Sequence, residues 1–288
     1  MLGAIIGDIV GSVYERQSIK TKSFPLFRDD CSFTDDTVMT IATAEALWKG
    51  AESNDFIEAY RKYGRAFPNV GYGRSFWQWL CSENPTPYNS FGNGSAMRVS
   101  PVARMLSLSS AEKYAKKSAE VTHNHPEGIR GAQAAAAAVF LASWWRFERD
   151  IPSVEERKRE VKAYVEETYG YDLDRTINEI KPTYTFEISC QETVPQAIIA
   201  FLESDGFEDA IRNAISLGGD SDTLAAITGS IAEAAYGIPP EIHNKALTYL
   251  PMPLFNAVDA WYTKMASVYR TGVFTRDPCI DLLQSGSI

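Results

Sequence analysis

The chain has 288 residues, of which 45% are hydrophobic and 23% charged, a length and composition that allow one large buried core. Its formal net charge of −9 excludes a broad basic face, so we expect no nonspecific binding of nucleic acid. The longest apolar candidate, residues 131–145, is shorter than the roughly 20 residues that a membrane span requires. We therefore expect a globular protein of the cytoplasm that does not enter a membrane.

The predicted secondary structure is helical along nearly the whole chain. The apolar start, Met1 to Val13, is interrupted by Asp8 and lacks the flanking features of a signal peptide, so we interpret it as a buried helix. Apolar residues recur at helical spacing in 38–48, 139–145, 198–202 and 224–231, and alternating strand patterns are nearly absent. The sequence therefore predicts an all-α fold, a single compact helical domain that covers residues 1–288.

Three further segments have distinct compositions. Residues 132–142 and 225–235 are rich in alanine, which lets neighbouring helices approach closely and predicts central helices. Residues 154–168 mix many charges with one apolar stripe, the pattern of an outer helix exposed to solvent. Residues 171–189 are the least regular part of the chain, and we expect a surface excursion or a lid there.

Two helices are predicted to begin with paired carboxylates and hydroxyl groups. The first start is FTDDT at residues 33–37, and the second is GGDSDT at residues 218–223. A simple structural explanation of the first is that Thr34 caps its helix, with Asp35 and Asp36 complementing the positive helix end, an arrangement worth about 1 kcal/mol. The second start favours a functional explanation, because two such starts can bring carboxylates and hydroxyls to one point.

Such a gathering of oxygen ligands suits a hard cation. Mg²⁺ and Mn²⁺ favour octahedral sets of oxygens, and Ca²⁺ accepts looser ones. Zinc is disfavoured, because no histidine or cysteine has ligand spacing near either start. Crowded carboxylates raise one another's pKa values unless cations neutralise them, which again favours divalent ions.

A glycine-rich turn, Phe91 to Arg98, leads into a predicted short helix. Its N–H groups can cradle a diphosphate, since glycines let a ligand approach the backbone closely. The turn matches neither the P-loop nor the dinucleotide fingerprint, so alone it is weak evidence.

Five motifs follow one another along the chain. They are Gly7-Asp8 with Gly11 and Glu15, FTDDT at 33–37, GNGSAMR at 92–98, THNHPEG at 122–128 and LGGDSDT at 217–223. In order and spacing, from Leu2 to about Gly237, they resemble the motifs of the ADP-ribosylglycohydrolases. Five motifs in sequence make coincidence implausible, although no one of them is specific alone.

The resemblance implies an all-helical fold with a dinuclear metal centre in a cleft, holding two Mg²⁺ or Mn²⁺ ions. The positions that match the family's metal ligands are Thr34, Asp35, Asp36, Asp220, Asp222 and Thr223.

It also implies residues that contact the substrate. The turn residues Gly92, Asn93, Gly94, Ser95, Ala96 and Met97 are expected at the diphosphate, and His125 near the ADP moiety. A helix-end or core role for His123 and His125 is an equal alternative. For proton transfer the candidates are Asp35, Asp36 and Glu15, and the alternative for Glu15 is an exposed loop glutamate beside Arg16.

The expected function is metal-dependent hydrolysis of the glycosidic bond between ADP-ribose and a modified acceptor. The expected substrate is a mono-ADP-ribosylated protein, with arginine favoured as the acceptor by analogy with bacterial relatives. One alternative is hydrolysis of O-acyl-ADP-ribose, ADP-ribosylated nucleic acid or another ADP-ribose conjugate. Another is a noncatalytic ADP-ribose-binding or crystallin-like protein. We expect a monomer.

Overall fold

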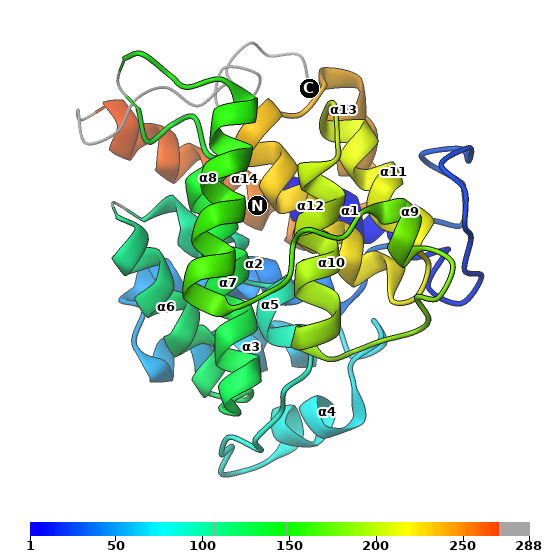
Figure 1. Ribbon diagram of the computed structural model, residues 1–288. Coiled ribbons are helices and arrows are strands. Elements are labelled where there is room, and N and C mark those ends of the chain that lie inside the picture. The colour runs from blue at the N-terminus through cyan, green and yellow to red at the C-terminus, as the bar shows by residue number, and fades with distance from the viewer. Residues whose placement is uncertain (106, 148, 271–288) are drawn as a thin grey trace.

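The computed structural model describes residues 1–105, 107–147 and 149–270. Within these residues the chain forms fourteen α-helices and one short 3₁₀ helix, and no strand (Figure 1). The helices are α1 (Leu2–Gly11), α2 (Asp35–Lys49), α3 (Ser53–Ala66), α4 (Arg74–Cys81), α5 (Gly94–Met97), η1 (Ser100–Arg104), α6 (Leu108–Glu120), α7 (Pro126–Ala142), α8 (Val154–Tyr169), α9 (Ile177–Ile180), α10 (Cys190–Leu202), α11 (Phe207–Leu217), α12 (Ser221–Tyr236), α13 (Pro240–Leu247) and α14 (Met252–Arg270).

The predicted all-α fold class is confirmed, and the helices pack into one compact domain. The predicted domain extends to residue 288, and residues 271–288 lie outside the described part of the chain. None of the helices described is both long enough and apolar enough to cross a membrane.

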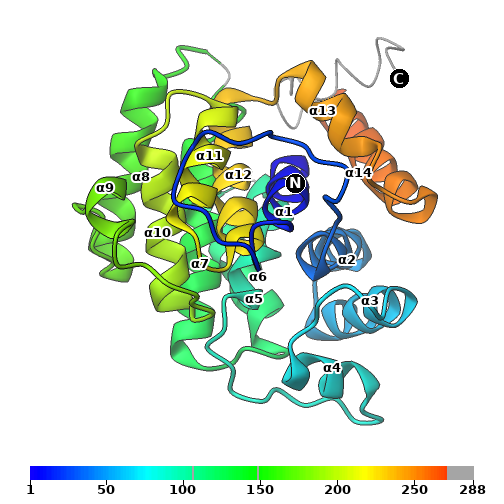
Figure 2. The same ribbon diagram turned by 90° about the vertical axis from the view of Figure 1, so that its right-hand side faces the viewer.

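The first helix is central although it opens the chain. Every residue of α1 is buried, and the helix lies between α12 and α2 (Figure 2). Its glycines at every fourth position, Gly3, Gly7 and Gly11, face α12 at very short range. A Cβ atom on Gly7 would lie 2.0 Å from the carbonyl oxygen of Ala225, and one on Gly11 would lie 2.5 Å from the Cα of Asp222. The backbones of α1 and α12 therefore meet directly, without side chains between them.

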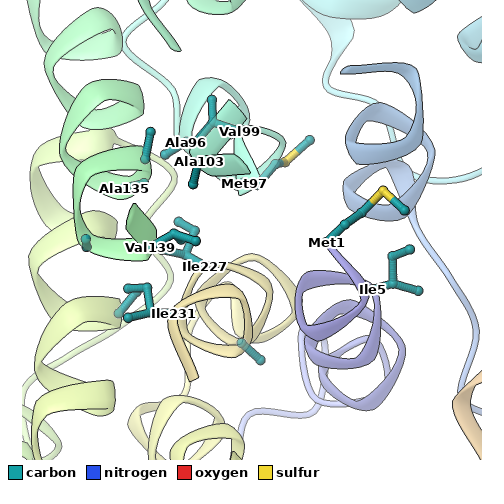
Figure 3. Close-up of a cluster of buried hydrophobic side chains, with 14 of the residues drawn as sticks. Met1, Ile5, Ala96, Met97, Val99, Ala103, Ala135, Val139, Ile227 and Ile231 are labelled. Carbon is teal, nitrogen blue, oxygen red and sulfur yellow. The ribbon is translucent and has the colours of Figure 1, made fainter. Parts of the chain in front are cut away.

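The alanine-rich segments form central helices, as the sequence predicts. The alanines of α7 and α12 are buried, and these helices pack against each other and against α10. Figure 3 shows part of the resulting core, in which Ala135 and Val139 of α7 approach Ile227 and Ile231 of α12. The charged segment forms α8, an outer helix that packs on α7 and begins with a capping box between Ser153 and Glu156.

A buried carboxylate ties α12 to the first turn of α1. Glu233 accepts hydrogen bonds from the amino group of Met1 at 2.7 Å, from the N–H of Gly3 at 2.8 Å and from the hydroxyl of Tyr262 at 2.9 Å. Arg104 lies 3.5 Å away. Burial alone would raise the pKa of Glu233, but the positive amino group and the Arg104 guanidinium hold it at about 2. Glu233 is therefore a charged group in the core.

Substituting Gly7 by alanine tests the contact between α1 and α12. We expect Gly7→Ala to lower the free energy of unfolding by about 1–3 kcal/mol or more, because the new methyl group meets backbone that cannot move away without separating the helices. Urea unfolding measures the change. Gly206→Ala is the matched control, since a Cβ at Gly206 meets nothing within 4 Å. Equal stability of the two variants would contradict the close packing.

Replacing Glu233 by glutamine tests the buried charge cluster. At pH 7 we expect Glu233→Gln to cost about 3 kcal/mol of stability, because the buried positive groups lose their counter-charge. The folded pKa of about 2 lies below the ordinary value of 4.5, so the carboxylate stabilises the fold above pH 4.5 and loses this contribution as the pH falls toward 2. Urea unfolding at several pH values should show that the difference in unfolding free energy between the variant and wild type becomes smaller as the pH falls from 4.5 toward 2. Exposed Glu241→Gln should show no such difference.

Candidate active site

The two acidic helix starts meet at one cavity. α2 begins at Asp35 and α12 at Ser221, and the Thr223 hydroxyl donates a hydrogen bond to Asp36 at 3.2 Å across 187 positions of sequence. The cavity has a volume of about 540 Å³, within the range of small-molecule sites. All six residues expected as metal ligands line it: Thr34, Asp35, Asp36, Asp220, Asp222 and Thr223.

Asp8 of α1 holds the start of α2 in place. Its buried carboxylate accepts hydrogen bonds from the N–H of Thr34 at 2.9 Å, from the Thr34 hydroxyl at 2.7 Å and from the N–H of Thr37 at 3.0 Å. The Thr37 hydroxyl donates a fourth. Thr34 also accepts from the N–H of Asp36, so the expected helix cap is present as well. The sequence prediction gave Asp8 no role at the site, although a lone acid in a wholly apolar helix was a usable signal.

The start of α12 is held by a glycine turn and by Asn93. Gly218 and Gly219 both have positive φ, 75° and 79°, a conformation that glycine adopts without strain. Lys20 donates hydrogen bonds to the carbonyl oxygens of Leu217, just before this turn, and of Tyr184. The side-chain amide of Asn93 donates to Asp220 at 2.7 Å. Asn93, expected at the diphosphate, therefore also orients an expected metal ligand.

The cavity crowds negative charge in a buried place. Burial and the neighbouring carboxylates, Asp8 first, raise the pKa of Asp35 to about 8. The same two causes raise the pKa of Asp36 and of Asp222 well above the usual value. Burial likewise raises the pKa of Asp8 to about 6, against the hydrogen bonds that it accepts. The arrangement is electrostatically unfavourable unless a positive charge is added.

The donor set fits hard cations. All six expected ligands offer oxygen, and one buried oxygen, Oδ1 of Asp36, has no hydrogen-bond partner within the described residues. Among those residues, no three His, Cys, Asp or Glu side chains converge closely enough to form a metal site by themselves. The fit therefore rests on the chemistry of the donors, two of which are threonine hydroxyls, and on the unpartnered oxygen.

Glu15 also lines the cavity, from the long loop between α1 and α2. Its side chain is half-buried, and burial, together with the charge of Asp220, raises its pKa. The structure thus brings all three residues expected in proton transfer to the same cavity. Glu15 differs from Asp35 and Asp36 in that a loop rather than a helix start presents it.

The glycine-rich turn is divided between cavity and core. Gly92, Asn93, Gly94 and Met97 line the cavity, whereas Ser95 and Ala96 are buried behind it, and Ser95 donates to the carbonyl oxygen of Gly128 at 2.7 Å. The N–H groups of Gly92 and Asn93 already donate to Ser90 and to the carbonyl oxygen of Ile188. As a cradle for a diphosphate, the turn therefore offers fewer free N–H groups than its sequence predicts.

The two histidines differ in their positions relative to the cavity. His125 is the N-cap of α7, where its Nδ1 accepts from the N–H of Glu127, and its ring contacts Phe91 edge-on. It is His123 that lines the cavity, with its ring 5.8 Å from that of Tyr88. Burial, with the charge of Arg98, lowers the pKa of His123 well below its usual value and keeps the ring neutral. His125 therefore occupies a helix end, which is the alternative that the sequence left open for it.

One wall of the cavity was not predicted at all. It consists of the loop that leads into α4 and the first turn of that helix, including Gly71, Arg74 and Phe76. The loop contacts the start of α2, since the N–H of Asp35 donates to the carbonyl oxygen of Val70 at 2.8 Å. Within residues 171–189, where a surface excursion or a lid was expected, the chain forms the short helix α9 and contributes Phe186 and Ile188 at the rim of the cavity, where both side chains are exposed.

Comparison with known proteins identifies similar sequences over most of the chain. The family model described as ADP-ribosylglycohydrolase matches residues 1–270. ADP-ribosylhydrolase ARH3 of Gallus gallus is 30% identical, with 83% of this chain and 86% of the relative covered. The Homo sapiens ARH3 is 28% identical, covering 83% and 84%. ADP-ribosylarginine hydrolase Tri1 of Pseudomonas putida (strain GB-1) is 27% identical, covering 84% and 71%.

A solved structure has a similar fold. The chain titled "ADP-ribosylglycohydrolase-related protein complex" superimposes with a TM-score of 0.64, covering 91% of this chain and 95% of its own length. The sequence identity is 24%, so this likeness concerns the fold.

An Asp8→Asn variant tests the support of the α2 start. The amide keeps the size of the carboxylate but presents an NH₂ group to the donors of Thr34 and Thr37, so buried donors lose their acceptor. We expect a loss of about 1–3 kcal/mol in the free energy of unfolding, measured in urea with EDTA present so that no cation contributes. Asp259→Asn, at an exposed position on α14, is the control. An Asp8→Asn variant as stable as wild type would contradict the described contacts.

Proposed function

The chain belongs to the ADP-ribosylglycohydrolase family, and from this membership we propose that it hydrolyses the glycosidic bond between ADP-ribose and a protein side chain, with two divalent cations at the starts of α2 and α12. The observation that carries the proposal is the meeting of Thr34, Asp35 and Asp36 with Asp220, Asp222 and Thr223 at one cavity. Buried carboxylates with raised pKa values and an unpartnered oxygen support cation binding there.

Mg²⁺ or Mn²⁺ would supply positive charge for ribose hydroxyls and for a water molecule at this end of the cavity. The side chains have separate tasks. Asp8 and Asn93 orient the helix starts through their hydrogen bonds to Thr34 and Asp220. Asp35, Asp36 or Glu15 transfers the proton that the leaving group requires. A raised pKa supports this role for Glu15, which is not among the expected ligands, because a carboxyl group whose pKa lies nearer to neutral pH holds and releases a proton more readily.

The ADP part of the substrate is proposed to occupy the part of the cavity that Gly92 and Gly94 line. These glycines let a ligand approach the backbone. The neutral ring of His123 and the ring of Tyr88 line the same region and offer flat surfaces for a base. We therefore assign to His123 the contact that the sequence led us to expect from His125.

Arginine is the acceptor that we propose to test first. One relative bears the name ADP-ribosylarginine hydrolase, which supports this choice. The exposure of the carboxylates gives further support. Glu15 and Asp35 are half-buried and can be reached from the cavity, whereas the other three, Asp36, Asp220 and Asp222, are buried. Two partly exposed carboxylates complement a positively charged guanidinium group.

The experiment measures the release of ADP-ribose from arginine-, serine- and acyl-linked conjugates with Mg²⁺ or Mn²⁺. We expect the arginine conjugate to be cleaved fastest, and EDTA to remove activity. Asp36→Asn and Asp222→Asn should each lower kcat by about 100-fold or more, because each removes a charged ligand from the cation site. Asp259→Asn controls for the loss of one negative charge at an exposed position.

If both variants retain full activity while metal remains bound, the catalytic centre must lie elsewhere in the protein. If the serine or acyl conjugate is cleaved faster, that linkage and not the arginine linkage is the preferred substrate, and the proposed site is unaffected. ADP-ribose binding by calorimetry, without turnover of any conjugate, would identify a binding protein instead of a hydrolase.

A further inference from the structure

An arginine that has no partner in the described part of the chain lies in the wall of this acidic cavity. Arg74, the first residue of α4, has an exposed side chain and lines the cavity together with Gly73, Ser75 and Phe76. It forms no hydrogen bond or ion pair with any described residue, including the carboxylates of the same cavity. The wall formed by α4 therefore carries a positive charge that no group within the described residues neutralises.

The backbone of the same turn adds donors. The first N–H groups of a helix have no partner within the helix, and Gly73, the N-cap of α4, has no side chain that can accept from them. Residues 73–76 all line the cavity. The first turn of α4 thus adds backbone N–H groups and the positive end of a helix to the Arg74 guanidinium.

A second cation, buried behind this turn, is an independent sign of an anionic ligand. The Arg98 side chain is 1% exposed, yet it lines the cavity and forms no ion pair with a described residue. Its Nη2 donates to the carbonyl oxygen of Ser118 and to the Thr122 hydroxyl, while its Nε has no hydrogen-bond partner. Its guanidinium carbon lies 4.4 Å from the centre of the Tyr60 ring and 5.9 Å from that of the Phe76 ring of α4. A buried charge without a counter-ion is costly, and a bound anion lowers that cost.

The positive wall begins directly beside the expected ribose site. A Cβ atom on Gly71 would lie 3.2 Å from Oδ1 of Asp35, and Arg74 follows three residues later. A ligand with a ribose at the carboxylates and a phosphate attached to it can therefore reach both. The glycine-rich turn on the other side has already used the N–H groups of Gly92 and Asn93, so a diphosphate there requires further donors.

We propose that Arg74 binds the diphosphate of the ADP-ribose unit, together with the N–H groups of the first turn of α4, and so selects substrates that carry this diphosphate. The inference rests on the proposed function and adds to it a side chain that determines specificity. Arg98 contributes positive charge from behind the turn, and Arg74 makes the direct contact.

The test compares Arg74→Lys, Arg74→Gln and Arg74→Glu in ADP-ribose binding, measured by calorimetry with Mg²⁺ present. We expect Kd to rise in the order Arg, Lys, Gln, Glu, with Arg74→Gln weaker than wild type by about 10-fold or more, the loss expected for one charge-assisted hydrogen bond. The dependence of Kd on salt should be smaller in Arg74→Gln. In turnover, KM should rise more than kcat falls. Arg159→Gln, at an exposed position on α8, is the control, and thermal unfolding verifies the fold of each variant.

Unchanged ADP-ribose affinity in folded Arg74→Gln overturns the inference, as does an equal loss in all three variants without the graded order. The proposed function fails separately if wild-type protein binds ADP-ribose with the graded dependence on Arg74 but hydrolyses no conjugate. Wild-type protein that binds no ADP-ribose at all overturns both.

Discussion

The direct backbone contact between α1 and α12 is the constraint on which the site depends. Because Gly7 and Gly11 have no side chains, α12 lies close enough for its acidic start to face that of α2. The same short helix carries Asp8, whose four hydrogen bonds fix the first turn of α2. One helix thus positions both halves of the cavity, one half through close packing and the other through a buried carboxylate.

The cavity combines two opposite electrostatic demands. Its carboxylates repel one another in a buried place, so they favour added cations. The wall formed by α4 instead carries Arg74, and the buried Arg98 lies behind it, so this side of the cavity favours an anion. A ligand satisfies both demands if one part is anionic and another part binds cations through neutral hydroxyl groups. ADP-ribose has this pattern, with a diphosphate next to a ribose. The polarity of the cavity and the family membership therefore point to the same class of substrate.

Much of this arrangement could be predicted from local sequence. Helical periodicity indicated the fold class, and the two acidic starts indicated residues that meet at the cavity, because both signals lie in local stretches of the sequence. Positions that depend on how the chain turns could not be predicted. His125 and His123 are two residues apart, yet the turn before Pro126 makes one a helix cap and places the other in the cavity. Arg74 gave no signal, since a lone arginine faces a ligand only if the loop before α4 places it there.

The separation in sequence between the partners has a consequence for biosynthesis. Gly3 and Glu233, which join α1 to α12, are 230 positions apart, and α12 leaves the ribosome long after α1. Until then the fully apolar face of α1 has no matching surface, and the nascent chain must keep it from aggregating. The carboxylates of α2 and α12 are not brought together at that stage either. The proposed cation site thus forms late, in nearly the same step that completes the core.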